Sequence, residues 1–276
     1  MKANESMKES QNTCIPSGFP MLDLLAGGYP KGKVIGVRYI GNEFQAGILQ
    51  EYMERQAVNL ALRQGTDRNV LLYTLVMDEK DLVASLLKGE YASVPELISS
   101  RLIVQTIDKG RKLPTPEEFH ENLKKVIDEY SIGAVIIDGI DELIPDDVHN
   151  QNAVSAELLE TLFELAAARD ILTIVTDYGN VWEASHSEYP FVAEIELNED
   201  VNGRTQGIFY SGKTRTVIED LFHAPDSVGI ELVRSALEYK RSNGRLPEAG
   251  DEFQDMVNAG ATIISLIDQS LNTRKP

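Results

Sequence analysis

Residues 38–44 lie where this chain would bind a phosphate, between a predicted buried strand at 32–37 and a predicted helix at 45–63. A phosphate-binding loop needs glycines whose backbone N–H groups close round the phosphate, a lysine that meets its charge, and a serine or threonine hydroxyl for Mg²⁺. This loop has one glycine, Gly41. The three positions where Gly-Lys-Thr is expected hold Phe44, Gln45 and Ala46. The sequence therefore predicts a degenerate nucleotide-binding loop.

Strands and helices alternate along most of the chain. Apolar runs predict strands at 70–75, 101–105, 134–137 and 171–176. Helical spacing of apolar residues predicts helices at 78–87, 115–130 and 153–169. The clearest helix start is Thr115-Pro116-Glu117-Glu118, which has an N-cap, a proline at the first helical position and a capping-box glutamate. This alternation predicts an α/β fold in which a mostly parallel central sheet carries helices on both faces.

The pattern changes in the last third of the chain. Residues 191–197, 207–211 and 216–218 predict successive strands that form an antiparallel edge of the sheet. Residues 225–276 predict a C-terminal helical extension with two apolar stripes, whose usual role is packing against the domain or against each other. Residues 1–13 are polar and predict a flexible N-terminus. The main domain is therefore expected to span residues 14–224.

Composition excludes several classes of function. The 276 residues carry a net charge of −18, whereas proteins that bind duplex DNA present Lys and Arg to the phosphates. No run of about 18 apolar residues predicts a membrane span, and residues 1–13 have no apolar segment typical of a secretory signal. The single cysteine, Cys14, excludes an intrachain disulfide and a cysteine-cluster metal site. We expect a cytoplasmic protein.

An ordered set of segments resembles the motor domain of DnaB-type replicative helicases, which are RecA-like P-loop ATPases. Ile15-Pro16-Ser17-Gly18-Phe19, with Leu22-Asp23 and Gly27-Gly28, is similar to the family's first motif. Residues 69–77 and 135–143 are similar to two of its strands and to the residues that follow them. The resemblance covers about residues 14–220 and implies a RecA-like P-loop fold with ATP and Mg²⁺ as cofactors. RecA-like ATPases of the cyanobacterial clock type share the first motif and are the second candidate family.

The resemblance assigns two positions in the nucleotide site. Asp138 stands where this fold class places the carboxylate that holds Mg²⁺ through water, and the alternative is an aspartate that caps the next turn. Val76 stands where the family has its catalytic glutamate, and a valine takes no proton. Asp78 and Glu79 either replace that glutamate or begin the next helix.

The resemblance also assigns a basic pair that would reach a neighbouring subunit, and two loops that would contact DNA. Lys213 and Arg215 stand where the family has Lys-x-Arg reaching a neighbouring subunit's site, and the alternative is an exposed basic pair on a turn. Residues 145–149 are acidic and residues 179–189 contain no Lys or Arg, where the family's loops are usually basic or polar. Trp182 either stacks on a base or contacts protein. We expect weak or no binding of nucleic acid.

Four parts of the family's machinery are missing together: the phosphate lysine, the Mg²⁺ hydroxyl, the catalytic glutamate and the basic DNA loop. The leading hypothesis is a pseudo-ATPase that acts by protein–protein contact in DNA replication, recombination or a mobile element. Its partner would be a RecA-like or DnaB-type ring, or a second copy of the chain. One alternative is an active, divergent ATPase or helicase that uses Gly41, Asp138 and a cation such as Arg38 or Lys213. Another is a regulator that binds a nucleotide without hydrolysing it.

Overall fold

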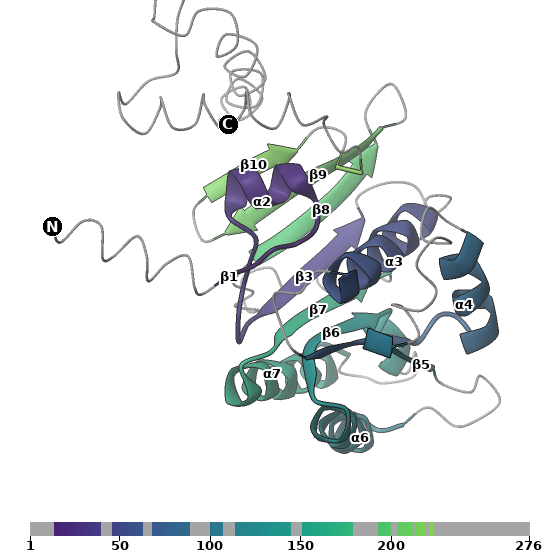
Figure 1. Cartoon of the computed structure of the whole chain (residues 1–276). Helices are drawn as coiled ribbons and strands as arrows, with labels where there is room; N and C mark the ends of the chain where they lie inside the picture. The colour runs from purple at the N-terminus through teal and green to yellow at the C-terminus, as the bar shows by residue number, and fades with distance from the viewer. Residues whose placement is uncertain are drawn as a thin grey trace, which may run out of the picture.

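One eight-stranded sheet forms the centre of the domain in the computed structural model (Figure 1). The structure describes residues 14–39, 46–62, 68–88, 100–106, 114–144, 151–178, 193–199, 204–211, 214–218 and 221–222. The predicted flexible N-terminus and the predicted helical extension at 225–276 therefore lie outside the described residues.

Six neighbouring strands of the sheet run parallel. In spatial order they are β8 (Ala193–Glu199), β3 (Val34–Tyr39), β7 (Leu172–Asp177), β6 (Ile132–Asp138), β4 (Asn69–Thr74) and β5 (Leu102–Thr106). Consecutive parallel strands need crossover connections, and described helices lie in the connections that join β3, β4, β5, β6 and β7 in chain order. The predicted mostly parallel sheet is confirmed.

The sheet continues past β8 with β9 (Thr205–Ser211) and β10 (Thr214–Ile218), which pair antiparallel in turn. The sequence predicted an antiparallel edge from residue 191 onward, but β8 itself pairs with β3 in parallel. The antiparallel pairing therefore begins one strand later than predicted. The reason is the strand order, which places β3 between β7 and β8, so that β8 joins the sheet beside β3 and parallel to it.

Helices cover both faces of the sheet (Figure 1). On one face lie α2 (Pro20–Ala26), α3 (Ala46–Leu62) and α4 (Glu79–Lys88). On the other lie α6 (Pro116–Glu129), α7 (Gln151–Arg169) and the short 3-10 helix η3 (Ile140–Leu143). A small hairpin of β1 (Cys14–Ile15) and β2 (Tyr29–Pro30) flanks α2. None of the described helices is both long enough and apolar enough to cross a membrane.

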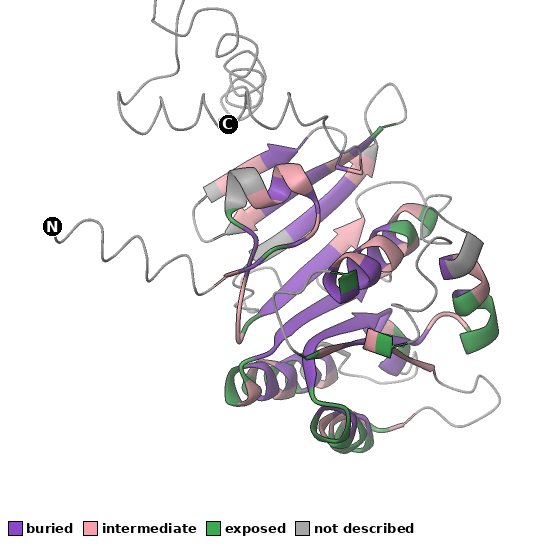
Figure 2. Cartoon of the chain, viewed as in Figure 1, coloured by how far each residue is buried: buried purple, intermediate pink, exposed green. Residues whose placement is uncertain are grey.

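Strands β4, β6 and β7 in the middle of the sheet are almost entirely buried, as the continuous apolar runs in the sequence predicted, whereas β5 at the edge is partly exposed (Figure 2). In β6 the side chains alternate: Ala134 and Ile136 pack with the α2–α3–α4 side, and Val135 and Ile137 pack with α6 and α7. On α6 the predicted face is the buried one, formed by Phe119, Leu123, Val126 and Ile127.

Local signals set the helix boundaries. The Thr115 hydroxyl accepts the Glu118 N–H at 3.2 Å, and the Glu118 carboxylate accepts the Thr115 N–H at 2.9 Å, so the predicted capping box is confirmed. The sequence analysis did not predict α2, although it begins with Pro20 and ends at Gly27, which has φ +81°.

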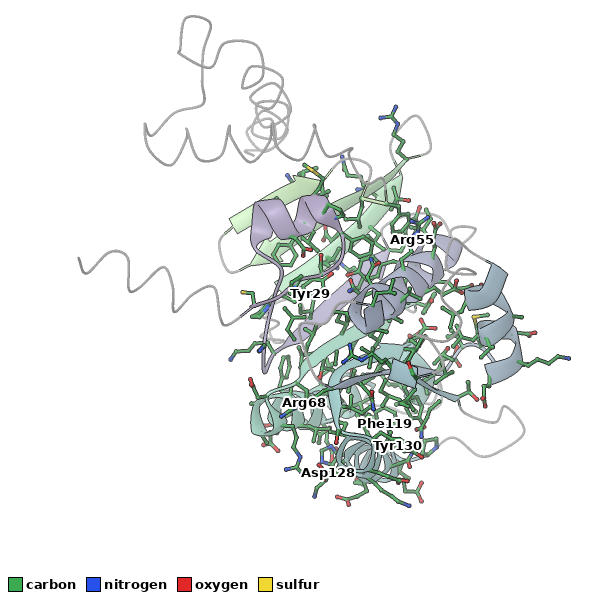
Figure 3. The ribbon with its side chains drawn as sticks, in the orientation of Figure 1. Tyr29, Arg55, Arg68, Phe119, Asp128 and Tyr130 are labelled. Atoms are coloured by element: carbon green, nitrogen blue, oxygen red, sulfur yellow. The ribbon has the colours of Figure 1, made fainter. Side chains whose placement is uncertain are left out.

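A buried polar network joins the α2 segment to α3. The Tyr29 hydroxyl lies 2.6 Å from the Tyr52 hydroxyl and donates to Gln56 Oε1 at 2.8 Å. Tyr29 is labelled in Figure 3. Gln56 Nε2 in turn donates to the backbone carbonyl of Ser17 at 2.6 Å. All four residues are buried, and burial raises the pKa of Tyr29. These contacts fix the first motif of the chain against the helix that follows the degenerate loop.

Candidate functional site

The site predicted from sequence lies at the carboxyl ends of the parallel strands. Strands β4, β6 and β7 are neighbours, so the residues at their ends meet at one edge of the sheet. These residues are Thr74 of β4, Asp138 of β6 and Thr176 of β7, with Tyr178 directly after β7. In open α/β sheets this edge is where ligands usually bind.

Asp138 accepts three hydroxyl hydrogen bonds. Thr74 Oγ1 donates to Asp138 Oδ2 at 2.8 Å. Thr176 Oγ1 and Tyr178 OH both donate to Asp138 Oδ1, at 3.2 and 2.9 Å. Only 2% of the Asp138 surface is exposed. The carboxylate is therefore held in one orientation, by side chains from both neighbouring strands.

The hydroxyls of the two threonines also accept backbone hydrogen bonds, so each one both donates and accepts. Thr74 Oγ1 accepts the N–H groups of Val76 and Met77, both at 3.3 Å, and Thr176 Oγ1 accepts the Gly139 N–H at 2.8 Å. These bonds tie the turns after β4 and β6 to the same network. A short hydroxyl side chain that turns back on nearby N–H groups is typical of a residue at a strand end.

Burial raises the pKa of Asp138, and the three hydroxyl donors act in the opposite direction. Burial and the neighbouring Asp138 charge raise the pKa of Tyr178, so its hydroxyl stays protonated and remains a donor. Asp141 contributes to both shifts and accepts the Tyr178 backbone N–H at 3.1 Å.

These residues do not fit the Mg²⁺ that the fold implies. Among the described residues, hydroxyls use both acceptor sites of Asp138 Oδ1 and one of the two sites of Oδ2, so this carboxylate has a single acceptor site left for a metal-bound water. Ala46, at the position of the usual serine or threonine, has no hydroxyl to act as the other protein ligand. Among the residues that the structure describes, no group of three or more His, Cys, Asp or Glu side chains could hold a metal ion.

Val76, at the position of the catalytic glutamate, is a packing residue. Gly139 has φ +79°, and a Cβ built on it would lie 2.5 Å from Val76 Cγ1. The valine thus lies close against the turn that follows Asp138, and no side chain other than hydrogen fits at Gly139. Asp78 does not replace the missing glutamate: its Oδ1 accepts the Asp81 N–H at 2.8 Å, which caps α4.

Residues 40–45, which include most of the predicted degenerate loop, lie outside the described residues, so Gly41 and Gln45 are not placed, and Ala46 is the first residue of α3. Strand β3, which precedes this loop, contains Arg38 as its second-last residue. Arg38 is one of the cations that the hypothesis of a divergent active ATPase would use. Arg38 forms an ion pair with Glu196 of β8, and 11% of each side chain is exposed. Its positive charge is therefore already matched by a carboxylate of the same chain.

A second polar network extends from this pair across the antiparallel strands. The Tyr210 hydroxyl of β9 donates to Glu196 Oε2 at 2.8 Å, and Arg215 Nε of β10 donates to the Tyr210 hydroxyl at 3.4 Å. The Arg215 guanidinium also lies over the Tyr210 ring, 5.9 Å from its centre. The sequence placed Arg215 on a turn, whereas it is the second residue of β10; Lys213 lies outside the described residues.

Sequence reasoning missed Thr74, Thr176 and Tyr178 at the first network, and Glu196 and Tyr210 at the second. A signal for the first set was present. Each of the three follows or ends an apolar run, and polar residues at the carboxyl ends of parallel strands are brought to one edge. No comparable signal marked the second set, because its contacts depend on β8 joining the sheet beside β3.

Among solved structures, the chain is similar to the crystal structure of a KaiC-like protein from the hyperthermophilic archaeon Pyrococcus horikoshii OT3, with a TM-score of 0.55 and 15% sequence identity. The match covers 74% of this chain and 93% of that one. No protein-family model matches the sequence. No curated protein matches it either. The chain therefore has a RecA-like, KaiC-like P-loop ATPase fold, and the comparison shows the fold alone.

Proposed function

We propose that this protein is a non-hydrolysing member of the RecA-like fold class that acts through protein–protein contacts. The observation that carries the proposal is the state of Asp138, whose carboxylate is 2% exposed and accepts three hydroxyl donors. In a working site of this fold that carboxylate orients Mg²⁺ through water. Here it orients the turns of its own domain.

The rest of the site supports the same function. The loop has Gln45 and Ala46 where a lysine and a hydroxyl are needed, and Val76 replaces a general base. Arg38, the nearest described cation at the end of β3, is paired with Glu196. Charge stabilisation by a lysine and a metal ion supplies much of the catalysis of phosphoryl transfer. Their joint loss is therefore expected to lower the rate of ATP hydrolysis by several powers of ten.

The setting that we propose is DNA replication or recombination, in a cell or on a mobile element, because the ordered motifs resemble DnaB-type helicases. The partner is either a RecA-like ring or a second copy of this chain. With a net charge of −18 and no Lys or Arg at 179–189, the chain is expected to bind free DNA weakly. Fluorescence anisotropy with a labelled single strand is expected to give no saturation at micromolar protein; tight, salt-dependent binding would support a helicase.

The direct test is phosphate release from ATP in the presence of Mg²⁺. We expect no turnover above the background of an EDTA control. Turnover on the order of 1 s⁻¹, the usual scale of such enzymes, would contradict the proposal if it is lost in Asp138→Asn. That variant keeps the size of the side chain and one acceptor oxygen, so loss of turnover would report chemistry and not unfolding. Calorimetry with a non-hydrolysable ATP analogue distinguishes a regulator that binds nucleotide without cleaving it from a pseudo-ATPase that binds no nucleotide.

A further inference from the structure

Of the three hydroxyl donors to Asp138, Tyr178 alone lies beyond the end of a strand. Thr74 is the last residue of β4 and Thr176 belongs to β7, whereas Tyr178 follows the last residue of β7. Carboxylates hold Tyr178 at both ends: its backbone N–H donates to Asp141 Oδ1 at 3.1 Å, and its hydroxyl donates to Asp138 Oδ1 at 2.9 Å. The residue therefore reaches from β7 to the end of the neighbouring strand β6.

Asp138 and Tyr178 both lie on the face of the sheet that carries α3. Side chains alternate along β6, so Asp138 shares the side of Ala134 and Ile136, which belong to the core under α3. The Tyr178 ring packs against the same core. It also lies close to the turn after β6, since a Cβ built on Gly139 would be 3.7 Å from Tyr178 Cδ2. The hydrogen bond from Tyr178 therefore reaches the carboxylate on the α3 side.

The Tyr178 hydroxyl makes the hydrogen bond that a metal-bound water would make. In a working site of this fold, the metal ion lies between a hydroxyl at the start of the helix after the loop and the carboxylate at the Asp138 position. Ala46, which stands at the position of that hydroxyl, begins α3, so a metal ion would approach Asp138 from the α3 side. The separation of 2.9 Å between the Tyr178 oxygen and Oδ1 is also an ordinary one for a water molecule. One acceptor site accepts one donor, so the tyrosine excludes the water from it.

Glu54 of α3 is a second carboxylate close enough to act on Tyr178. Burial raises the pKa of Tyr178 most, and the charges of the nearby carboxylates, Glu54 among them, raise it further. The two oxygens of Glu54 accept hydrogen bonds from other groups, Gln50 Nε2 at 2.8 Å and Ser85 Oγ at 3.0 Å. The tyrosine hydroxyl thus stays protonated, and its proton is directed to Asp138.

We propose that Tyr178 is a built-in plug, whose hydroxyl takes the place of a metal-bound water on Asp138 Oδ1. The excluded ligand is a hydrated divalent cation, and with it the triphosphate that such a cation accompanies in this fold. This inference rests on the proposed function and deepens it, because it names the residue that closes the site from within the chain. Thr74 and Thr176 orient the carboxylate, whereas Tyr178 occupies it.

The test is binding of Mn²⁺ alone, measured from the electron paramagnetic resonance signal of the free ion. All the compared chains carry Ala46→Ser, which restores a hydroxyl at the start of α3. Adding Tyr178→Phe is expected to lower the Mn²⁺ dissociation constant about tenfold, since it removes a competing hydrogen bond to a charged group. Adding Asp138→Asn as a third substitution is expected to abolish that gain. Binding of Mn²⁺ to the acidic surface is common to all the chains, so the differences report the site.

Thr74→Val, in the same Ala46→Ser chain, is the matched control. It also removes a hydroxyl donor to Asp138, at 2.8 Å, but leaves Tyr178 in place, so no gain is expected. Tyr178→Phe keeps the ring and its packing, and far-UV circular dichroism is expected to match that of the parent chain. Tyr178→Leu, which removes the hydroxyl and the ring, is a second variant that is expected to give the same gain.

Any of four results overturns the inference. They are equal Mn²⁺ binding with and without Tyr178→Phe, an equal gain in the Thr74→Val control, a gain that survives Asp138→Asn, and loss of the fold in both Tyr178 variants, which would make Tyr178 a purely structural residue. A negative Mn²⁺ result leaves the expected absence of ATP turnover untouched. ATP turnover by the wild type overturns the proposed function whatever the Mn²⁺ result, so the two failures are distinguishable.

Discussion

The two polar networks of this domain differ in how they end. The Asp138 network lies at the carboxyl edge of the sheet. Its three hydroxyl donors all end at the carboxylate of Asp138, a residue that is 2% exposed. The Arg38–Glu196 network begins with an ion pair and ends at Arg215, a half-buried residue of the edge strand β10. The first uses its polar groups within the domain, while the second carries a cation to the border of the sheet. Among the described residues, the first network is thus completed at the Asp138 carboxylate, whereas the second reaches a guanidinium on the last strand of the sheet.

The largest effect is expected from breaking the ion pair. Glu196→Gln leaves the Arg38 guanidinium without its carboxylate, although Nε of Arg38 is already buried and has no partner among the described residues. Removing one member of a largely buried pair costs about 3 kcal/mol of the free energy of unfolding. Urea denaturation measures this, with the exposed Glu160→Gln of α7 as the control. Equal stability of the two variants would mean that the pair contributes nothing.

A smaller effect is expected at the closed network. Asp138→Ala removes the acceptor of three hydroxyls, which costs about 2 kcal/mol of unfolding free energy. The comparison is Asp128→Ala on α6, where Asp128 is labelled in Figure 3. This substitution breaks an exposed ion pair with Arg169 at 2.8 Å and is expected to cost less than about 0.5 kcal/mol. If the two substitutions lower the free energy of unfolding equally, the Asp138 network contributes no more to stability than an exposed ion pair does.

The pH dependence of stability sharpens the comparison further. Because burial raises the pKa of Asp138, its contribution is fully present below the ordinary aspartate pKa of about 3.9 and is lost as the pH rises through the folded-state value. Wild type is therefore expected to lose stability relative to Asp138→Asn between about pH 4 and neutrality, by no more than about 1.4 kcal/mol per pH unit for one proton. A constant difference across this range would show that Asp138 titrates normally.

Much of the fold could be predicted because its signals are local. Helix α6 needed only the capping box at Thr115 and an apolar stripe, and both occur within one stretch of sequence. The boundaries were less secure: β3 begins two residues after the predicted position, because Lys31 and Gly32 form a turn in which Gly32 has φ +65°. A turn with positive φ is not visible in an apolar pattern.

The candidate site was predictable in part. Asp138 was identified because it ends an apolar strand, and Val76, Gln45 and Ala46 were identified by their positions in the resemblance. The sequence by itself determined that positions 44–46 hold Phe, Gln and Ala, since a residue type is fixed whatever the fold. That these are the positions of the phosphate lysine and the Mg²⁺ hydroxyl stays a prediction. The sequence also determined the alternation of strands and helices, since hydrophobic period and capping act over a few residues.

Only the tertiary structure decided what Asp138 and Arg38 do instead. The hydroxyl donors to Asp138 are 64, 38 and 40 residues away in sequence, and Glu196 is 158 residues from Arg38. Such partners are set by the order of strands in the sheet, and that order depends on the crossovers that place β4 and β7 beside β6 and β8 beside β3. A carboxylate at a strand end has the same sequence signature whether it faces a metal ion or three hydroxyls. The neighbouring strands choose between the two, because they alone determine which donors lie within hydrogen-bonding distance.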